Sequence, residues 1–174
     1  LIVSNTVRLQ RLVDDMLTLS KSESAIEPLP LKNIDVVPLA ADVLRTWESQ
    51  AEAKRISLTL EADAGPQIAH ADEQSVDQIL VNLVDNAIKY SDEGSEVSIR
   101  VFRKKRFVRI AVTDNGPGIP LNHQKRIFER FYRVDAGRSR TLGGTGLGLS
   151  IVRHLAERMG GRISLKSQIG RAHV

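Results

Sequence analysis

The chain has 174 residues, of which 41% are hydrophobic and 26% are charged, a composition typical of a globular protein. No apolar run approaches the ~20 residues that a membrane-spanning helix needs. Cysteine is absent, which excludes disulfides and thiolate metal sites. The net charge is +4, but only 4% of residues are aromatic and there is no RNA-stacking motif, so we expect no nucleic-acid partner.

The first 22 residues have the apolar spacing of a helix with a narrow seam. Ile2, Leu9 and Met16 recur every seven residues along it. The polar stretch 20–30 contains two prolines and indicates a linker. Because a linker separates this helix from the rest of the chain, its apolar stripe favours packing against a helix from outside this chain. Packing of the helix on its own domain is the alternative.

Beyond the linker, strand and helix patterns alternate without a strict parallel βαβ rhythm, which favours an α/β sandwich with a mixed sheet. We expect strands over 31–36, 56–61, 97–102, 107–113 and 162–166, and helices over 38–54, 72–88, 122–128 and 146–159. Asp72 is the expected N-cap of the second of these helices. The strands on either side of the basic run 103–106 are expected to pair antiparallel.

Two glycine-rich segments follow the last of these paired strands. Residues 114–120 turn at once, and glycines there permit close backbone approach while Asp114 offers a carboxylate. Residues 143–149 run into a helix start, where backbone N–H groups bind anions. The second segment has neither the Lys-Ser/Thr pair of a Walker loop nor the spacing of a dinucleotide fingerprint. Taken alone, the first segment indicates a capped turn, and a mobile hinge is the alternative for the second.

The long predicted helix also carries polar residues that share one face. Asn82, Asn86 and Lys89 stand at positions i, i+4 and i+7, and Tyr90 follows. Asparagine carbonyls are ligands that suit Mg²⁺, and a lysine one turn later suits phosphate. A polar outer stripe on an amphipathic helix is the alternative.

A fourth segment, 128–133, places two aromatic residues three positions apart. On a helical turn, Phe128 and Phe131 would face the same way. They would then anchor a flap formed by the polar stretch 135–142, or else mark an ordinary edge of the core.

Taken together and in this order, the four segments resemble the catalytic domain of sensor histidine kinases. Residues 82–91 resemble that family's N box and residues 114–119 its first glycine box. Residues 128–133 resemble its F box, and residues 144–149 its second glycine box. Each segment is weak evidence by itself, but four in the family's order are a specific signal.

The resemblance implies the Bergerat fold, a two-layer α/β sandwich with a mixed sheet and helices on one face, preceded by one bundle helix. Residues 1–24 would be the second helix of a dimerisation and phosphotransfer hairpin, and 25–30 the linker. Residues 31–174 would be the ATP-binding catalytic domain, cut short at its C-terminus. A lid is expected between the F box and the second glycine box.

The resemblance also implies that the chain binds ATP with Mg²⁺. Asp114 would accept a hydrogen bond from the adenine amino group. Asn86 would hold the metal ion, supported by Asn82, while Lys89 and Arg133 would face phosphate oxygens. The other expected nucleotide contacts are Tyr90, Gly116, Gly118, Ile119, Phe128, Phe131, Gly144, Thr145, Gly146, Leu147 and Gly148. Three further basic residues lie on the lid side without an assigned role: Arg130, Arg138 and Arg140.

One position separates kinases from hydrolases within this fold. Gyrase-like, MutL-like and Hsp90-like members resemble one another in having a glutamate, four residues before the magnesium asparagine, that activates water. Here that position is Asn82, an amide that does not take a proton from water. We therefore expect a protein histidine kinase.

In the family the phosphate acceptor is a histidine in an H box, followed by Glu or Asp, a hydrophobic residue and Arg. The histidines of this chain, His70, His123, His154 and His173, have no such neighbours. We therefore expect a fragment that starts inside the bundle and does not phosphorylate itself alone.

The implied function is transfer of the ATP γ-phosphate to the kinase's own H-box hairpin, and onward to a response-regulator aspartate in two-component signalling. The expected partners are that hairpin, a homodimer partner and the response regulator. The expected location is the cytoplasmic part of a membrane-bound sensor, with upstream segments making the only membrane contact. Two alternatives remain: a non-catalytic ATP-binding module, and a nucleic-acid binder recognised by a salt-sensitive shift with DNA but none with nucleotide.

Overall fold

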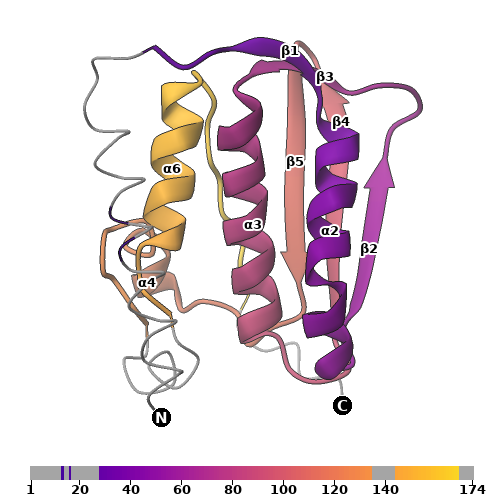
Figure 1. The fold of residues 1–174 in the computed structure, drawn as a ribbon. Helices are drawn as coiled ribbons and strands as arrows, with labels where there is room; N and C mark the ends of the chain where they lie inside the picture. Colours follow the sequence, from indigo (N-terminus) through magenta and orange to yellow (C-terminus); the bar gives the residue numbers. More distant parts are fainter. Residues whose placement is uncertain (1–12, 14–15, 17–27, 135–143, 169–174) are drawn as a thin grey trace. The chain divides into compact units, whose positions relative to one another are not determined.

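The computed structural model of the protein describes Val13, Met16 and residues 28–134 and 144–168 (Figure 1). Val13 and Met16 are helical, and the rest of the expected bundle helix lies outside the described residues. The expected lid, residues 135–142, also lies outside them.

The described residues fall into two compact units that meet in sequence between Gly118 and Ile119. The unit from Leu29 to Gly118 contains β1 (Lys32–Asp35), α2 (Val36–Ala53), β2 (Ser57–Ala62), β3 (Ile68–Ala71), α3 (Glu73–Tyr90), β4 (Glu96–Lys104) and β5 (Phe107–Asp114). The unit from Ile119 to Gln168 contains α4 (Leu121–Gln124) and α6 (Gly148–Arg158). Among the described helices, none is both long enough and apolar enough to cross a membrane.

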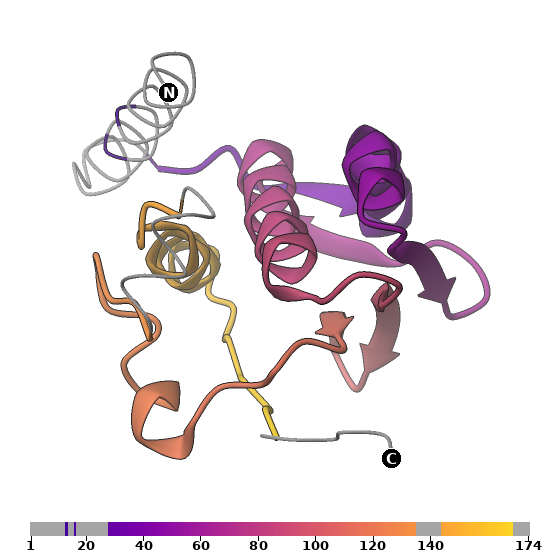
Figure 2. The same cartoon turned by 90° about the horizontal axis from the view of Figure 1, so that it is seen from below.

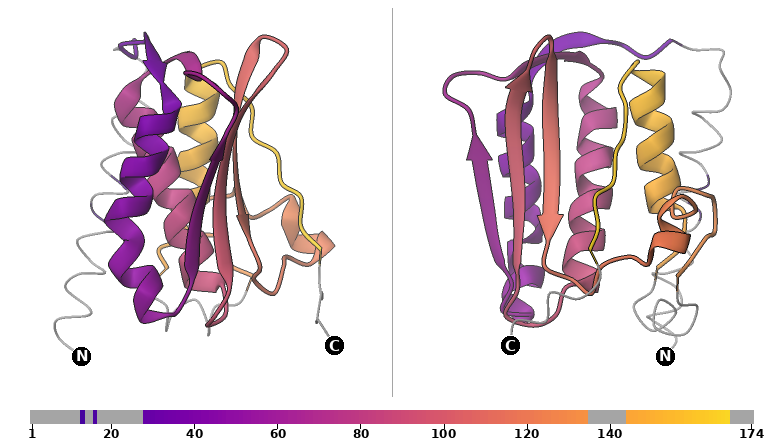
Figure 3. Two further views of the ribbon diagram at one scale, coloured as in Figure 1. Left: turned by 90° about the vertical axis from the view of Figure 1, so that its right-hand side faces the viewer. Right: turned by 180° about the vertical axis from the view of Figure 1, so that it is seen from behind.

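The main sheet of the first unit is mixed, as the sequence predicts. Its order is β2-β4-β5, with β2 parallel to β4 and β5 antiparallel to β4. Helices α2 and α3 lie side by side over one face of this sheet (Figures 2 and 3). The predicted two-layer α/β arrangement is therefore confirmed in this unit.

The core of this unit lies between α3 and the middle strand. Val97, Ile99 and Val101 alternate along β4 and are fully buried, while the residues between them are exposed or half-buried. Leu80 and Val84 of α3 are also fully buried. Strand side chains alternate between two faces, and helix side chains return to the same face every turn. The buried positions of β4 and α3 therefore determine which side of α3 faces the sheet.

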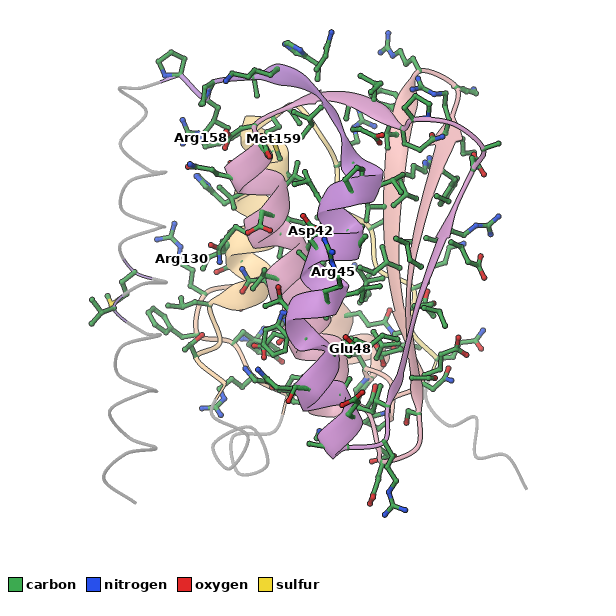
Figure 4. All side chains as sticks on the ribbon, turned by 45° about the vertical axis from the view of Figure 1, so that its right-hand side comes forward. Asp42, Arg45, Glu48, Arg130, Arg158 and Met159 are labelled. Atoms are coloured by element: carbon green, nitrogen blue, oxygen red, sulfur yellow. The ribbon has the colours of Figure 1, made fainter. Side chains whose placement is uncertain are left out.

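Both long helices begin at an aspartate that accepts hydrogen bonds. Asp72 Oδ2 accepts from the backbone N–H of Ser75 at 2.9 Å and from its hydroxyl at 2.6 Å, which confirms the predicted cap of α3. Asp35 caps α2, which therefore begins two residues earlier than predicted. On the outer side of α2, Asp42, Arg45 and Glu48 are exposed (Figure 4).

One strand was missed, and two expectations about secondary structure are wrong. Strand β3 was not predicted, and it pairs antiparallel with β1 in a separate two-stranded sheet. Residues 162–166 are described and form no strand, because an apolar alternation becomes a strand only where another strand pairs with it. The helix expected over 122–128 ends at Gln124 and continues as turns.

The cap of α3 gives a stability prediction. Replacing Asp72 with Ala removes the acceptor for Ser75, and we expect the free energy of unfolding to fall by about 1 kcal/mol. Asp72→Asn keeps an acceptor oxygen and is the matched control. Urea denaturation measures both, and equal stabilities for the Ala and Asn variants would contradict the role of the cap.

Candidate functional site

The polar face of α3 is set by its buried face. Asn82, Asn86 and Lys89 are half-buried, beside the buried residues Val84 and Ala87. All three predicted residues therefore lie on one side of the helix without entering the core. Their amide and ammonium groups lie at the border between the core and solvent.

Asn82 is bonded to its own helix. Its Nδ2 donates to the Gln78 carbonyl at 2.9 Å, so its side-chain oxygen is the group left to accept hydrogen bonds. An amide in this position has no basic atom that takes a proton from water. Residue 82 therefore lacks the group that a general base needs.

Lys89 forms an ion pair with Asp85, one turn earlier on α3. Both side chains are about four-fifths buried, with exposed fractions of 18% and 21%. Asp85 Oδ2 accepts from Lys89 Nζ, while the buried Oδ1 of Asp85 has no hydrogen-bond partner among the described residues. A carboxylate oxygen without a donor, next to Asn86 in sequence, suits a metal ion or its bound water.

Asp85 was missed by the sequence-based site prediction. The available signal was its spacing of four residues from Lys89, a spacing that brings opposite charges together on a helix. The spacing does not predict that the Asp85–Lys89 pair is buried, because burial depends on the packing of α3.

The first glycine box forms a tight turn at the end of β5. Asp114 Oδ1 accepts from the Gly116 N–H at 2.9 Å. A Cβ atom at Gly116 would lie 2.8 Å from that oxygen and 3.2 Å from the Tyr90 carbonyl oxygen. A larger residue would require the Asp114 carboxylate to move, and the turn lies close to the backbone at the end of α3. Asp114 is exposed, and its second carboxylate oxygen has no partner among the described residues.

The unit from Ile119 to Gln168 fixes the predicted residue Ile119 by its backbone. The Ile119 N–H donates to Ser167 Oγ at 2.8 Å, and its carbonyl accepts from Gln124 Nε2 at 2.8 Å. Gln124 Nε2 also donates to the Ser167 carbonyl. Ser167 is thus joined to Ile119 and Gln124 by hydrogen bonds that involve side chains.

The F box and the second glycine box contact each other within this unit. The Phe131 N–H donates to the Gly146 carbonyl at 2.9 Å. Gly146 has a φ of +76°, and a Cβ atom there would lie 3.0 Å from the Phe131 backbone. This hydrogen bond therefore joins Phe131, which precedes the segment 135–143, to Gly146, which follows it. The segment itself lies outside the described residues.

The expectation that Phe128 and Phe131 share a face is wrong. Phe128 is half-buried, but Phe131 has a φ of +60° and a side chain 57% exposed. A bulky residue rarely adopts this left-handed conformation, because its side chain crowds the backbone. The backbone bond to Gly146 holds Phe131 in this conformation.

The second glycine box leads into α6 without a side-chain cap. Leu147 is fully buried at the N-cap position, and its N–H donates to Thr145 Oγ1 at 3.2 Å. No side chain among the described residues caps the first turn that starts at Gly148, while Gly144 lies half-buried before it. The first N–H groups of α6 remain for an external acceptor.

Arg133 is half-buried, and two of its three guanidinium nitrogens have no partner among the described residues. These two, Nε and one terminal nitrogen, are inaccessible to solvent. Burying a guanidinium without an acceptor is costly, so the side chain is suited to an anion.

A small cluster beside α4 was not predicted. The His123 ring is hydrogen bonded to the Tyr132 hydroxyl, and the Arg126 guanidinium lies 4.2 Å from the centre of the Tyr132 ring. The hydrogen bond with Glu129 raises the pKa of Arg126 above its ordinary value. These contacts fix the turn that presents Arg133.

Comparison with known proteins gives this geometry a family. The model of histidine kinase-, DNA gyrase B- and HSP90-like ATPases matches residues 71–173. The sensor-like histidine kinase SenX3 of Mycolicibacterium smegmatis is 41% identical over 97% of this chain and 44% of its own length. The chain spans less than half the length of the first curated relatives that it matches.

Solved structures agree with the sequence comparison. Full-length ShkA in complex with AMPPNP has a TM-score of 0.80 and 31% identity, over 93% of this chain and 33% of that one. Histidine kinase ThkA in complex with the response regulator protein TrrA has a TM-score of 0.73 and 28% identity, over 92% of this chain and 43% of that one. The chain therefore belongs to the family of histidine kinase-, DNA gyrase B- and HSP90-like ATPases, as the ATPase domain of a sensor histidine kinase.

Proposed function

We propose that this chain binds Mg-ATP and presents its γ-phosphate to a histidine on the H-box hairpin of the same kinase, for onward transfer to a response-regulator aspartate. The observation that carries the proposal is the contact between the glycine turn and the end of α3. A Cβ at Gly116 would displace the Asp114 carboxylate and lie tightly against the Tyr90 carbonyl oxygen. This contact brings the Asp114 carboxylate, the proposed acceptor for the adenine amino group, into the same small region as Lys89 and Tyr90.

The described side chains fit a magnesium nucleotide. Asn86 is half-buried and offers a carbonyl oxygen, and Asp85 on the same turn of α3 has a buried carboxylate oxygen without a donor among the described residues. Amide and phosphate oxygens are hard ligands of the kind that Mg²⁺ prefers. When bound, Mg²⁺ neutralises phosphate charge.

The basic groups have separate tasks in this proposal. Lys89 reaches phosphate oxygens at the cost of weakening its ion pair with Asp85. Arg133 gives its unpaired donors to phosphate, and the N–H groups at the start of α6 do the same. Transfer then breaks the bond from the γ-phosphorus to its bridging oxygen and forms one to the acceptor imidazole, with ADP leaving.

The structure of ThkA with a response regulator supports the onward partner, and the ShkA complex supports the nucleotide class. Asn82 supports kinase over hydrolase chemistry. Its Nδ2 is committed to the Gln78 carbonyl, and an amide does not activate water. The sensor's membrane attachment, its homodimer and residues 1–24 as the second hairpin helix belong to the same proposal.

Nucleotide binding is the first test. ADP at roughly 100 times its Kd should stabilise the folded chain by about 2.7 kcal/mol, seen as a raised melting temperature. Asp114→Asn should narrow the difference in affinity between ADP and GDP, because an amide presents a donor where adenine needs an acceptor. Asp42→Asn, on the exposed side of α2, is the matched control. Absence of both a thermal shift and calorimetric heat at millimolar ADP would contradict the site.

The metal site gives the second test. Asn86→Ala should weaken Mg-ATP binding by on the order of tenfold or more, because it removes an oxygen ligand, and should affect Mg²⁺-free ADP far less. Asn33→Ala is the matched control, because it removes an exposed asparagine of β1 that is not proposed to bind the metal ion. Isothermal calorimetry with and without Mg²⁺ measures the difference. Equal losses for both nucleotides would indicate a folding defect instead.

The third test concerns the acceptor. This chain alone should transfer no phosphate to its own histidines, because none has H-box neighbours and positioning supplies most of the catalysis. A separately supplied dimeric hairpin with an H box should become labelled from γ-labelled ATP. Acid-labile, base-stable label on the 174-residue chain alone would refute this reading.

A further inference from the structure

The turn between α2 and β2 is joined to the loop between α3 and β4. The Lys54 carbonyl accepts from the Gly94 N–H at 3.2 Å, and the Ser57 N–H donates to the Ser95 carbonyl at 3.0 Å. Arg55 also pairs with Glu93, but both side chains are mostly exposed, so this ion pair adds little. The two connections therefore form one backbone-bonded corner of the unit.

Lys54 reaches from this corner to the end of α3. Its ammonium donates to the Ile88 carbonyl at 2.8 Å and to the Lys89 carbonyl at 3.0 Å. The last carbonyls of a helix lack partners within the helix, and they carry the negative end of its dipole. A half-buried ammonium with several donors satisfies two of them at once.

The turn of α3 that Lys54 holds is the turn that bears the site. It carries the Lys89 side chain, which is paired with Asp85. One residue later, the Tyr90 carbonyl oxygen lies against Gly116 in the glycine turn of Asp114. A shift of this last turn would therefore move the phosphate-side lysine and the support of the adenine-side turn together.

We propose that Lys54 is a positioning residue for the nucleotide site, which it orders through the carbonyls of Ile88 and Lys89. The assignment rests on the proposed function. Without the ammonium, the two carbonyls turn toward water and the last turn of α3 frays. Nucleotide then binds only the fraction of molecules in which that turn is formed.

The test compares changes at the two ends of α3. Lys54→Met keeps the length of the side chain and removes the charge, and we expect ADP affinity to fall by about tenfold if roughly one-tenth of molecules keep the ordered turn. Lys54→Arg, which can donate to both carbonyls, should restore affinity to within about threefold of the unmodified chain. Asp72→Ala weakens the opposite end of the same helix, and its ADP affinity should stay within about twofold. Calorimetry is done well below the lowest melting temperature of the set.

Amide hydrogen exchange in the nucleotide-free chain separates positioning from general destabilisation. Exchange at Tyr90 and Ser91 should rise in Lys54→Met and not in Asp72→Ala. Unchanged ADP affinity in Lys54→Met, or equal losses in Lys54→Met and Asp72→Ala, would overturn the assignment while leaving the proposed function intact. Failure of the unmodified chain to bind ADP would instead defeat the proposed function, and the assignment with it.

Discussion

The packing of α3 on β4 is the constraint on which the rest of the first unit depends. Leu80 and Val84 of α3 are fully buried, as are Val97, Ile99 and Val101 of β4, and the two elements contact each other. A close-packed interior leaves little rotational freedom, so this contact fixes the direction in which Asn82, Asn86 and Lys89 project. The hydrophobic core thus sets the site geometry before any polar contact forms.

The same helix is held at both ends by charged groups of different origin. Asp72 caps its start from the adjacent residue, so that end is a local feature of the chain. Lys54 caps its end from the turn after α2, and Gly116 then lies against the next carbonyl. One end therefore affects mainly stability, while the other also affects the position of the residues proposed to contact nucleotide.

The charged groups proposed to bind phosphate are either paired with another side chain or without a partner in this structure. Lys89 is paired with Asp85 in this structure, and Arg133 has buried donors without partners among the described residues. Phosphate bound at Lys89 would leave Asp85 without its cation, and magnesium would compensate that carboxylate. Asn82 offers no group that takes a proton from water, in keeping with the proposed transfer to a histidine.

The sequence by itself determined the elements whose signal is local. These are the period of α3, the cap at Asp72, the antiparallel pair β4–β5, and the order of four motifs that identified the family. Tertiary structure alone decided the features that need a partner distant in sequence. Strand β3 is only four residues long, and it exists because β1 pairs with it. Residues 162–166 have the alternation of a strand but no such pairing. Phe131 points into solvent because a backbone bond to Gly146 holds it in a left-handed conformation. Lys54 lies 34 residues from the first carbonyl that it binds, and backbone carbonyls leave no pattern in a sequence, so its place at the site follows only from the fold.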